Sequence, residues 1–586
     1  MNSRRAQLYW FVLFTGPALA GFAVFNLWPM VYSLWLSFCQ YDVVAAPRFI
    51  GLRNYLYLIG ADPAFWPSVK VTLLFTVVQV PLSVASALGV ALLLNQPVRA
   101  RGFWRAVYFL PSILPQAASV AVFVYIFQAD GGLLNRLLAL MGITGPAWTT
   151  SPAWALPVVV LISLWGFGYP MVIFLGGLQT VPRELYEAAH IDGAGTWARF
   201  RHVTLPLISP VLFFNVVMGV IGALKVFDLA YAFGAAQGLI PGGPARATLF
   251  YGLNLYQQAF TYFHMGLASA MAWLLFAVIV ASRGSTSASA AAGCTTGTDM
   301  EHHRSRRLTF LLTALLALGA LVMVLPLGWM LLTSLKTFPE ILRNPTPLIP
   351  ALPQWVNYQT VWDGFAYHRF FLNSVFVAAM VVTGTVLTCC PAAYAFAYYE
   401  VRHRDLLFGL LLSTLMLPAQ VTIIPLFKAY AALGWVNTYL PLVLPAWLGG
   451  NVFGIFLLRQ FFRTVPKSLI EAARLDGASE WTILWRLVVP MSLPAVLTVV
   501  LFTFLWSWND LFNPLVYLHS ETAYTLPVGL LYFIARAEQL TGGSAGQVPW
   551  HLVMALATVM VLPVIVLFVA AQRRFVEGVA ATGVKG

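Results

Sequence analysis

Two passages of this chain place charged and small residues at one repeated spacing. Their members are Glu187, Ala188, Ala189, Asp192, Gly193 and Ala194 in the first copy, and Glu471, Ala472, Ala473, Asp476, Gly477 and Ala478 in the second. Neither passage combines a nucleophile, a base and an orienting group, so the pattern does not predict catalysis. The alanines keep one face thin enough for close approach, and the carboxylates can orient a partner or cap a helix. This chemistry indicates docking.

The two passages are copies of one another. Residues 180–210 and 464–494 align without a gap, and 13 of the 31 positions are identical. Composition alone would give roughly two or three matches. The chain therefore contains an internal repeat, with equivalent residues 284 positions apart at this point.

Each copy is predicted to form a helical hairpin. Pro182 stands where a first short helix begins, and Gly193 stands where the chain must turn. A second short helix follows, because apolar residues recur at helical spacing in both copies. These residues are Trp197, Phe200 and Thr204 in the first copy and Trp481, Leu484 and Val488 in the second. A hairpin of this kind could also pack beneath its own bundle or lie at the lipid surface, but two copies at one topological location favour docking.

The composition predicts an integral membrane protein. Of the 586 residues, 60% are hydrophobic and only 9% are charged, with a mean hydropathy of +0.80, whereas about a quarter of residues are charged in soluble domains. The net charge of +13 comes from short basic clusters between apolar runs. Such clusters orient membrane proteins, so nucleic-acid binding is excluded. The four cysteines have no metal-ligand spacing, and no metal site is predicted.

Twelve apolar segments are long enough to cross a bilayer, which needs roughly 20 residues. They lie near 10–38, 71–94, 106–128, 153–178, 205–224 and 265–281, and near 308–335, 371–399, 406–427, 439–458, 491–509 and 552–571. Six spans in each half preserve orientation across the repeat, so the repeat is parallel. The predicted fold is all-α, with a first half at 1–281, a flexible cytoplasmic linker at 282–306 and a second half at 307–586.

The basic residues predict the orientation. With the N-terminus inside, the cytoplasmic connections carry 22 of the 33 Lys and Arg residues, so the positive-inside bias places both termini in the cytoplasm. Both repeated passages then lie in the cytoplasm, between the fourth and fifth spans of their half. The N-terminal apolar run is too long for a cleaved signal and is predicted to be the first span.

The centre of the chain looks like a junction between two proteins. Residues 281–300 are small and polar, which is typical of a flexible linker. Met300 precedes the sequence EHHRSRRLTFLL, which has the character of a natural start. We hypothesise that two subunits have been fused, natively or through read-through or a frame change.

The repeated passages resemble the coupling loop of permease subunits of ATP-binding-cassette (ABC) importers. Further stretches are similar to the carbohydrate-uptake branch, which includes the maltose and glycerol-phosphate permeases. They are residues 49–76, 226–260, 334–342, 355–362, 371–374, 506–515 and 573–586. The resemblance implies the fold of a type I ABC importer in a bacterial inner membrane. It also implies that the two repeated passages, with the six residues named above in each, contact two cytoplasmic ATPase subunits. Those subunits would bind ATP and Mg²⁺. An external solute-binding protein would deliver a sugar.

The energy source is predicted to lie outside the chain. No G-x-x-x-x-G-K-[ST] phosphate loop occurs. No predicted span contains Asp, Glu, Lys, Arg or His in its interior, although ion-coupled transporters commonly place such residues there. Their absence argues against a twelve-span secondary transporter, which is the alternative from another class. That alternative stays open because sodium can be coupled through backbone carbonyls. Within the resemblance, glycerol 3-phosphate is the alternative solute, and no buried basic cluster favours it.

A path for the solute, or a contact with its binding protein, is suggested by aromatic and amide side chains. Trp506, Trp508, Asn509, Asp510 and Asn513 stand at the outer end of the eleventh span, and stacking with hydrogen bonding suits a sugar. Interfacial tryptophans and a simple helix end are the structural alternative. Phe227 and Asp228 are predicted to belong to an external loop, and Asn215 lies inside the fifth span, where it could equally join two helices.

Overall fold

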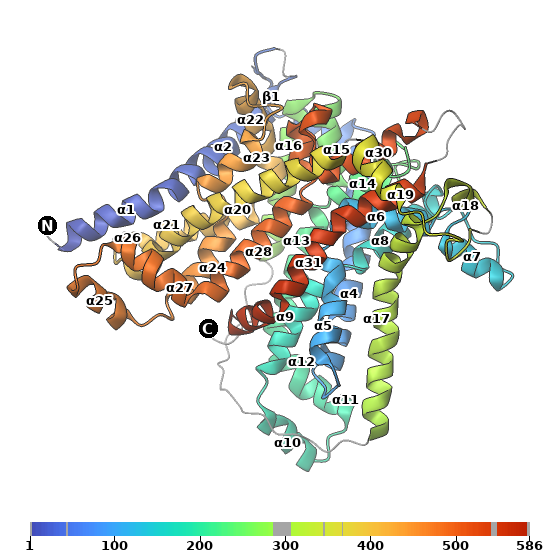
Figure 1. Ribbon diagram of the computed structural model, residues 1–586. Helices are drawn as coiled ribbons and strands as arrows, with labels where there is room; N and C mark the ends of the chain where they lie inside the picture. Colours follow the sequence, from blue (N-terminus) through green and yellow to red (C-terminus); the bar gives the residue numbers. More distant parts are fainter. Residues whose placement is uncertain are drawn as a thin grey trace.

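The computed structural model describes residues 3–42, 45–284, 306–343, 346–365, 367–540 and 548–582. Figure 1 shows an assembly of long helices with short helices and loops at their ends. Most of the predicted linker, 285–305, lies outside the described residues. The described residues are overwhelmingly helical, so the predicted all-α class is confirmed.

The described residues of the first half form sixteen α-helices and one small antiparallel pair of strands. They are α1 (Ser3–Phe22), α2 (Trp28–Ser37), β1 (Cys39–Gln40), β2 (Arg48–Phe49), α3 (Arg53–Gly60), α4 (Phe65–Leu94), α5 (Arg101–Ile113), α6 (Gln116–Ile126), α7 (Leu133–Leu140), α8 (Pro152–Leu164), α9 (Gly168–Gln179), α10 (Arg183–Ile191), α11 (Thr196–Arg199), α12 (Leu205–Leu207), α13 (Ser209–Leu224), α14 (Asp228–Ala235), α15 (Tyr251–Tyr256) and α16 (Met265–Gly284). Three π-helical segments occur within these residues, η1 (Ala23–Leu27), η2 (Phe200–Thr204) and η3 (Gln257–Thr261).

The second half is described from α17 onward. Its α-helices are α17 (Arg306–Ser334), α18 (Phe338–Leu342), α19 (Val356–Gln359), α20 (Tyr367–Tyr398), α21 (Arg404–Ser413), α22 (Ala419–Ala432), α23 (Leu440–Trp447), α24 (Val452–Phe462), α25 (Lys467–Leu475), α26 (Glu480–Ile483), α27 (Val489–Met491), α28 (Leu493–Asn509), α29 (Phe512–Tyr517), α30 (Leu526–Leu540) and α31 (Trp550–Thr582). The shorter turns are η4 (Thr360–Gly364), η5 (Thr414–Met416), η6 (Leu484–Val488) and η7 (Glu521–Ala523).

The predicted spans coincide with helices or with helix pairs. Within the described residues, six helical segments are long and apolar enough to cross a membrane, and four bent pairs raise the number to ten if each pair is one span. Two shorter apolar helices occur as well, and the first of them, 265–281, is the predicted sixth span. The second, 526–536, was not predicted as a span, and the predicted ninth span, 406–427, is not among the membrane-crossing segments of the described residues.

The third span of each half was predicted as a single segment, and the structure breaks both. In the first half α5 and α6 meet at 94°, where Leu114 is extended before Pro115. In the second half Leu417 is extended before Pro418, at the start of α22. A proline disfavours helical backbone in the residue that precedes it and removes one hydrogen-bond donor, so both helices end there.

The first span of each half packs against the other half. Phe11 and Phe14 of α1 contact Phe396 and Tyr394 of α20, with ring centroids 5.6 and 5.9 Å apart. On the opposite side, Tyr108 of α5 donates a hydrogen bond to the carbonyl oxygen of Leu316 in α17 at 3.0 Å. Figure 1 shows α1 beside α20 and α17 beside α5. The two halves are therefore interleaved rather than merely adjacent.

An Asn-Tyr dipeptide closes the first span in both halves. Asn54 donates to the carbonyl oxygens of Ser37 and Cys39, both at 2.9 Å. Asn357 donates in the same way to Ser334 at 2.8 Å and to Lys336 at 2.9 Å. The last carbonyl oxygens of a helix have no hydrogen-bond donor within the helix. The buried side-chain amide of Asn54 donates to those at the end of α2, and that of Asn357 donates to those at the end of α17. The repeat thus extends to individual hydrogen bonds.

The first half carries an insertion that reaches the second half. Asn54 and Asn357 are 303 positions apart, whereas the docking passages are 284 apart, so 19 extra residues lie between them in the first half. This longer stretch contains α7. Arg136 donates to the carbonyl oxygen of Thr346, and the Thr346 hydroxyl donates to Gly131 at 3.1 Å. The insertion therefore joins the halves near α18.

Candidate docking loops and solute path

Both repeated passages form the predicted helical hairpins. Helices α10 and α25 begin directly after Pro182 and Pro466, because the fixed φ of proline suits the start of a helix, where no N–H donor is needed. Two residues after the end of each helix stands a glycine with positive φ, +78° at Gly193 and +80° at Gly477. Residues with a Cβ atom rarely adopt this backbone conformation, so glycine fixes the turn into the second short helix.

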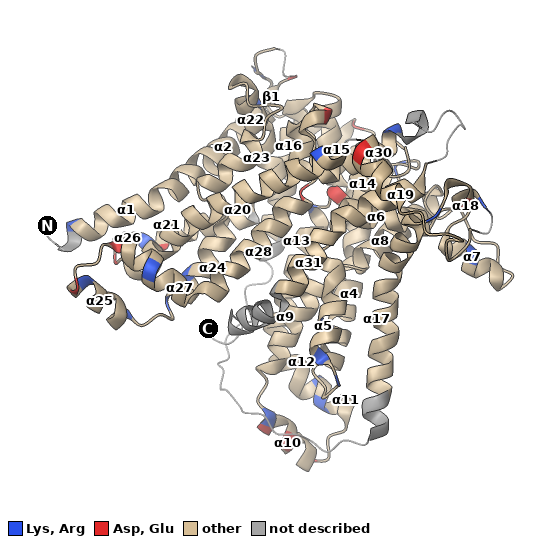
Figure 2. Ribbon diagram, in the orientation of Figure 1, with Lys and Arg blue, Asp and Glu red and all other residues tan. Residues whose placement is uncertain are grey.

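The hairpins lie at the ends of the molecule opposite β1, α14 and α15 (Figure 1). Charged residues are sparse on the long helices and lie mainly near their ends, among them those around α10 and α25 (Figure 2). Glu187, Asp192, Glu471 and Asp476 are all exposed, and so are both glycines. The acidic groups are therefore free to meet a partner.

Each hairpin also exposes apolar residues at equivalent positions. Ile191 and Leu475, the last residues of α10 and α25, are 85% and 88% exposed. Leu185 and Leu469 are exposed as well, and so are Trp197 and Trp481. Members of each pair are 284 positions apart. Exposed apolar groups ringed by charges are typical of a protein contact surface.

The two hairpins are stabilised internally by different bonds. In the first, the Tyr186 and Thr204 hydroxyls are 2.9 Å apart and share a hydrogen bond. The equivalent residues in the second are Ile470 and Val488, both buried apolar side chains. The second hairpin instead contains an ion pair in which Arg474 donates to Glu480 at 2.6 and 3.1 Å.

A cavity of about 400 Å³ lies among α20, α23, α24 and α28. The predicted residues Trp506 and Asp510 line it, together with Ser507 from the same stretch. Further polar lining comes from residues that the sequence analysis did not single out, namely Asn26, Ser374, Thr385, Thr414, Asn451, Thr503 and Thr525. Asn26 and Thr503 are isolated polar residues inside apolar runs, which was the available signal for them, whereas Ser374 and Thr414 each follow another polar residue.

Two of these polar residues are bonded to each other across helices. The Asn451 amide donates to the Thr503 hydroxyl at 2.9 Å, and its oxygen accepts from the backbone of Gly454. Asn451 therefore caps α24 and ties it to α28. The Thr385 hydroxyl is buried and has no partner within the described residues.

The remaining predicted path residues lie outside the cavity lining. Trp508 is buried and donates to the carbonyl oxygen of Met560 at 3.1 Å. Asn509 donates to Ile113 of the other half at 3.0 Å. Asn513 donates to Asp510 at 2.9 Å, and Asn215 donates to Val211 within its own helix at 2.9 Å.

Phe227 and Asp228 lie at the contact between the halves rather than on a free external loop. The Phe227 ring contacts Phe512 edge to face, with centroids 4.6 Å apart. Asp228 begins α14, and one of its carboxylate oxygens is buried without a partner among the described residues. Two carboxylates, Asp228 and Asp510, therefore follow the fifth-span helices α13 and α28 of their halves.

The described residues contain no group of three or more His, Cys, Asp or Glu side chains that could hold a metal ion. Cys389 and Cys390 are fully buried in α20, and Cys39 is buried at β1. These cysteines fill the interior of the protein. Cys294 lies outside the described residues.

Comparison with known proteins gives two matches to one family, the binding-protein-dependent transport system inner membrane component, over residues 79–288 and 384–580. The chain is 40% identical over 267 residues to the probable ABC transporter permease protein YesP of Bacillus subtilis, which covers 45% of this chain and 85% of the relative. It is 34% identical over 286 residues to the trehalose/maltose transport system permease protein MalF of Thermococcus litoralis, covering 48% and 92%.

Other relatives show the same coverage. The arabinooligosaccharides transport system permease protein AraQ of Halalkalibacterium halodurans is 32% identical over 290 residues, which is 49% of this chain and all of the relative. Among solved structures, a bacterial ABC transporter involved in the import of alginate matches 47% of this chain and 99% of its own, at 25% identity and a TM-score of 0.42. YesP, MalF and AraQ each match about half of this chain, and the family model matches it twice, so two units of this family are joined in one polypeptide.

Proposed function

Because the chain belongs to the family of binding-protein-dependent transport system inner membrane components, we propose that it forms the membrane pathway of a sugar importer powered by separate ATPase subunits. The family model matches both halves, so one chain supplies both permease units. The names of two relatives, trehalose/maltose and arabinooligosaccharide permeases, support a sugar as the solute. The chain is a transport component rather than an enzyme.

The observation that carries the proposal is the matched exposure of Ile191 and Leu475. A permease with two docking hairpins at equivalent positions suits two copies of an ATPase. The partner subunits hold ATP and Mg²⁺, and closure on ATP moves α10 and α25. The acidic residues Glu187, Asp192, Glu471 and Asp476 orient the partners, while the alanines beside them permit close contact.

The solute path runs through the cavity lined by α20 and α28. Trp506 offers an aromatic face for stacking, and Asn451, Thr503 and Asp510 offer donors and acceptors for sugar hydroxyls. About 400 Å³ is a size suited to a small saccharide. Trp508, Asn509 and Asn513 hold the end of α28 in place through the bonds that they make to Met560, Ile113 and Asp510. Asn215 bonds within its own helix and remains a candidate contact with the solute. An external solute-binding protein delivers the sugar on the side of α14, near Phe227 and Asp228.

The orientation follows from the docking role. Since ATP is present only in the cytoplasm, α10 and α25 face that compartment. Both termini then lie in the cytoplasm, as the basic residues predict. The protein is a multi-pass component of a bacterial inner membrane.

The test is transport in proteoliposomes that contain this chain, its ATPase subunits and its binding protein. We expect uptake of a labelled sugar that requires ATP and the loaded binding protein. Uptake that proceeds without nucleotide and stops when an ion gradient is removed would contradict the proposal and favour a secondary transporter. Ligand identification on the binding protein distinguishes a neutral sugar from glycerol 3-phosphate.

A further inference from the structure

One carboxylate connects the second docking hairpin to a membrane-spanning helix. Glu480, at the start of α26, accepts two hydrogen bonds from Arg474 of α25, at 2.6 and 3.1 Å. Its Oε2 atom also accepts a hydrogen bond from the Tyr394 hydroxyl of α20 at 2.6 Å. The Glu480 side chain is only 13% exposed. Helices α25, α26 and α20 therefore meet at this single group.

The bonds at Glu480 are of the strong kind. Hydrogen bonds to an ionised group are shorter and roughly twice as strong as neutral ones, and the bidentate arginine contact fixes the relative orientation of its two helices. A partly buried network of this type acts as a unit, because removal of one member leaves the others without partners.

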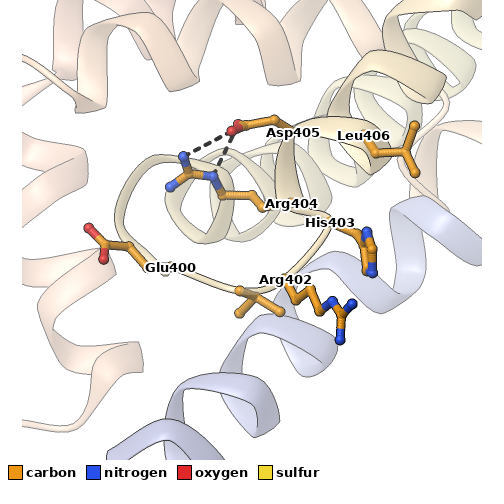
Figure 3. Close-up of a pocket in the computed structure, with 7 residues that line it drawn as sticks. Glu400, Arg402, His403, Arg404, Asp405 and Leu406 are labelled. Carbon is orange, nitrogen blue, oxygen red and sulfur yellow. Dashed lines mark hydrogen bonds and ion pairs between the residues drawn. The ribbon is translucent and has the colours of Figure 1, made fainter.

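Neighbouring ion pairs do not provide an equivalent link. Glu400 and Lys467 approach to 3.8 Å, but both side chains are exposed. Asp405 is paired with Arg404 at the start of α21, as Figure 3 shows, and it is 72% exposed. Its other partner, Arg459 of α24 at 3.4 Å, is not on α25 either. Exposed pairs contribute about 0–1 kcal/mol. Glu480 is thus the stronger connection between α25 and α20.

The first hairpin has different residues at the equivalent positions. His190 stands in the place of Arg474, and Thr196 stands in the place of Glu480. A histidine and a threonine cannot form a bidentate ion pair. The first hairpin uses the Tyr186–Thr204 bond instead, and that bond lies within the hairpin and η2.

Helix α20 also lines the cavity. Ser374, Val377, Val381 and Thr385 of this helix contribute to its wall. Tyr394 follows Thr385 by nine residues, about 14 Å along the same helix. A displacement applied at Tyr394 therefore reaches the cavity through one rigid element.

We propose that Glu480 is a positioning residue that transmits movement of α25 to α20, and hence to the cavity, so that the two docking hairpins are mechanically unequal. The inference rests on the proposed function, because α25 moves only if an ATPase docks there. The second hairpin drives the cavity wall directly through Tyr394. The first hairpin has no equivalent of the Glu480–Tyr394 bond, because Thr196 stands in the place of Glu480.

The experiment uses the reconstituted complex with its ATPase subunits and loaded binding protein. The variants are Glu480→Gln, Tyr394→Phe and the double variant, with Thr196→Val as the matched control in the first hairpin. We expect Glu480→Gln to lower the kcat of binding-protein-stimulated ATP hydrolysis and the uptake rate by about tenfold. Basal hydrolysis, ATPase binding and the KM for the binding protein stay at wild-type values.

Two further results are expected if Arg474, Glu480 and Tyr394 act together. Tyr394→Phe lowers stimulation, and its loss does not add to that of Glu480→Gln in the double variant. Arg474→Lys, which keeps one charged bond, retains more stimulation than Arg474→Met. Thr196→Val changes stimulation by less than about twofold.

Normal stimulation in both Glu480→Gln and Tyr394→Phe would overturn the inference. An equal loss in Thr196→Val, or a loss of ATPase binding in Glu480→Gln, would overturn it as well. Failure of the proposed function is a separate result, because the wild-type complex would then show no ATP-dependent uptake at all.

Discussion

Asp228 and Asp510 each follow the end of the fifth-span helix of their half, and the charge on Asp510 acts on Asp228. Burial, and then the negative charge of Asp510, raise the pKa of Asp228 to about 7. Burial also raises the pKa of Asp510, to about 6, although Asn513 donates to it. Both groups therefore resist ionisation where the halves meet.

This pair predicts a pH-dependent stability. An aspartate whose pKa is raised in the folded protein stabilises it fully at pH values below its ordinary pKa near 4, and this contribution is lost as the pH rises through about 7. We expect the melting temperature in detergent to fall between pH 5 and pH 8, and Asp228→Asn to reduce that fall. Asp363→Asn, at an exposed position, is the control. Identical pH dependence in wild type and Asp228→Asn would contradict the prediction.

The exposed apolar pair predicts the contact with the ATPase. Ile191→Glu and Leu475→Glu place a charge where each hairpin offers an apolar group, so each variant should weaken binding of purified ATPase subunits by about tenfold or more. The double variant should abolish binding while the protein still folds. Ile240→Glu is the control, since Ile240 is 81% exposed but lies elsewhere. Equal effects of the control and the hairpin variants would refute the assignment.

Replacement of the two turn glycines is predicted to uncouple ATP hydrolysis from transport. Proline requires φ near −65°, whereas φ is +78° at Gly193 and +80° at Gly477. The variant Gly193→Pro with Gly477→Pro should insert into the membrane yet show no substrate-stimulated ATP hydrolysis. Alanine at both positions meets no atom within 4 Å, and its strain is about 1–2 kcal/mol per site, so that pair should retain part of the stimulation. Full stimulation in the proline variant would count against coupling.

The cavity predicts a position where bulk blocks transport. Val381 lines the cavity, so Val381→Trp should stop sugar uptake without affecting ATPase binding. Leu372, on the same helix, is 59% exposed and does not line the cavity. Leu372→Trp should therefore leave uptake close to wild type. Similar uptake by the two variants would show that solute passes elsewhere.

The paired asparagines predict a stability cost shared by both halves. Asn54→Ala and Asn357→Ala each leave two helix-end carbonyls without a partner, at about 1–3 kcal/mol each. Both variants should lower the melting temperature, and their effects should add because the sites are in different halves. Gln359→Ala, an exposed change beside Asn357, should have no effect. A lower melting temperature in only one of the two variants would show that the two Asn-Tyr dipeptides are not equivalent.

The sequence predicts the repeat, the hairpins and the location of the spans well, because hydropathy and short motifs are local properties. It does not predict which prolines interrupt a helix. Pro81, Pro391 and Pro563 lie inside unbroken helices, whereas Pro115 and Pro418 follow extended residues. A proline inside a helix leaves a backbone carbonyl oxygen without its N–H donor, and the helix continues where neighbouring helices or side chains compensate for that loss. Such neighbours cannot be predicted from the local sequence.

The placement of polar path residues is beyond local patterns for a similar reason. Trp506 and Trp508 are two residues apart and chemically alike, yet the first lines the cavity and the second bonds Met560. Asp228 was expected on an external loop, but α14 packs it where the halves meet. Only tertiary packing separates these roles.

The interleaving of the first spans has a consequence for synthesis. α1 packs against α20, which begins more than 300 residues later in the chain. At about 5–20 residues per second, a ribosome needs roughly 20–70 s to cover that distance. During this interval α1 stands in the bilayer without its final neighbour. Because both units are in one polypeptide, α20 inserts into the membrane close to the α1 helix of the same chain.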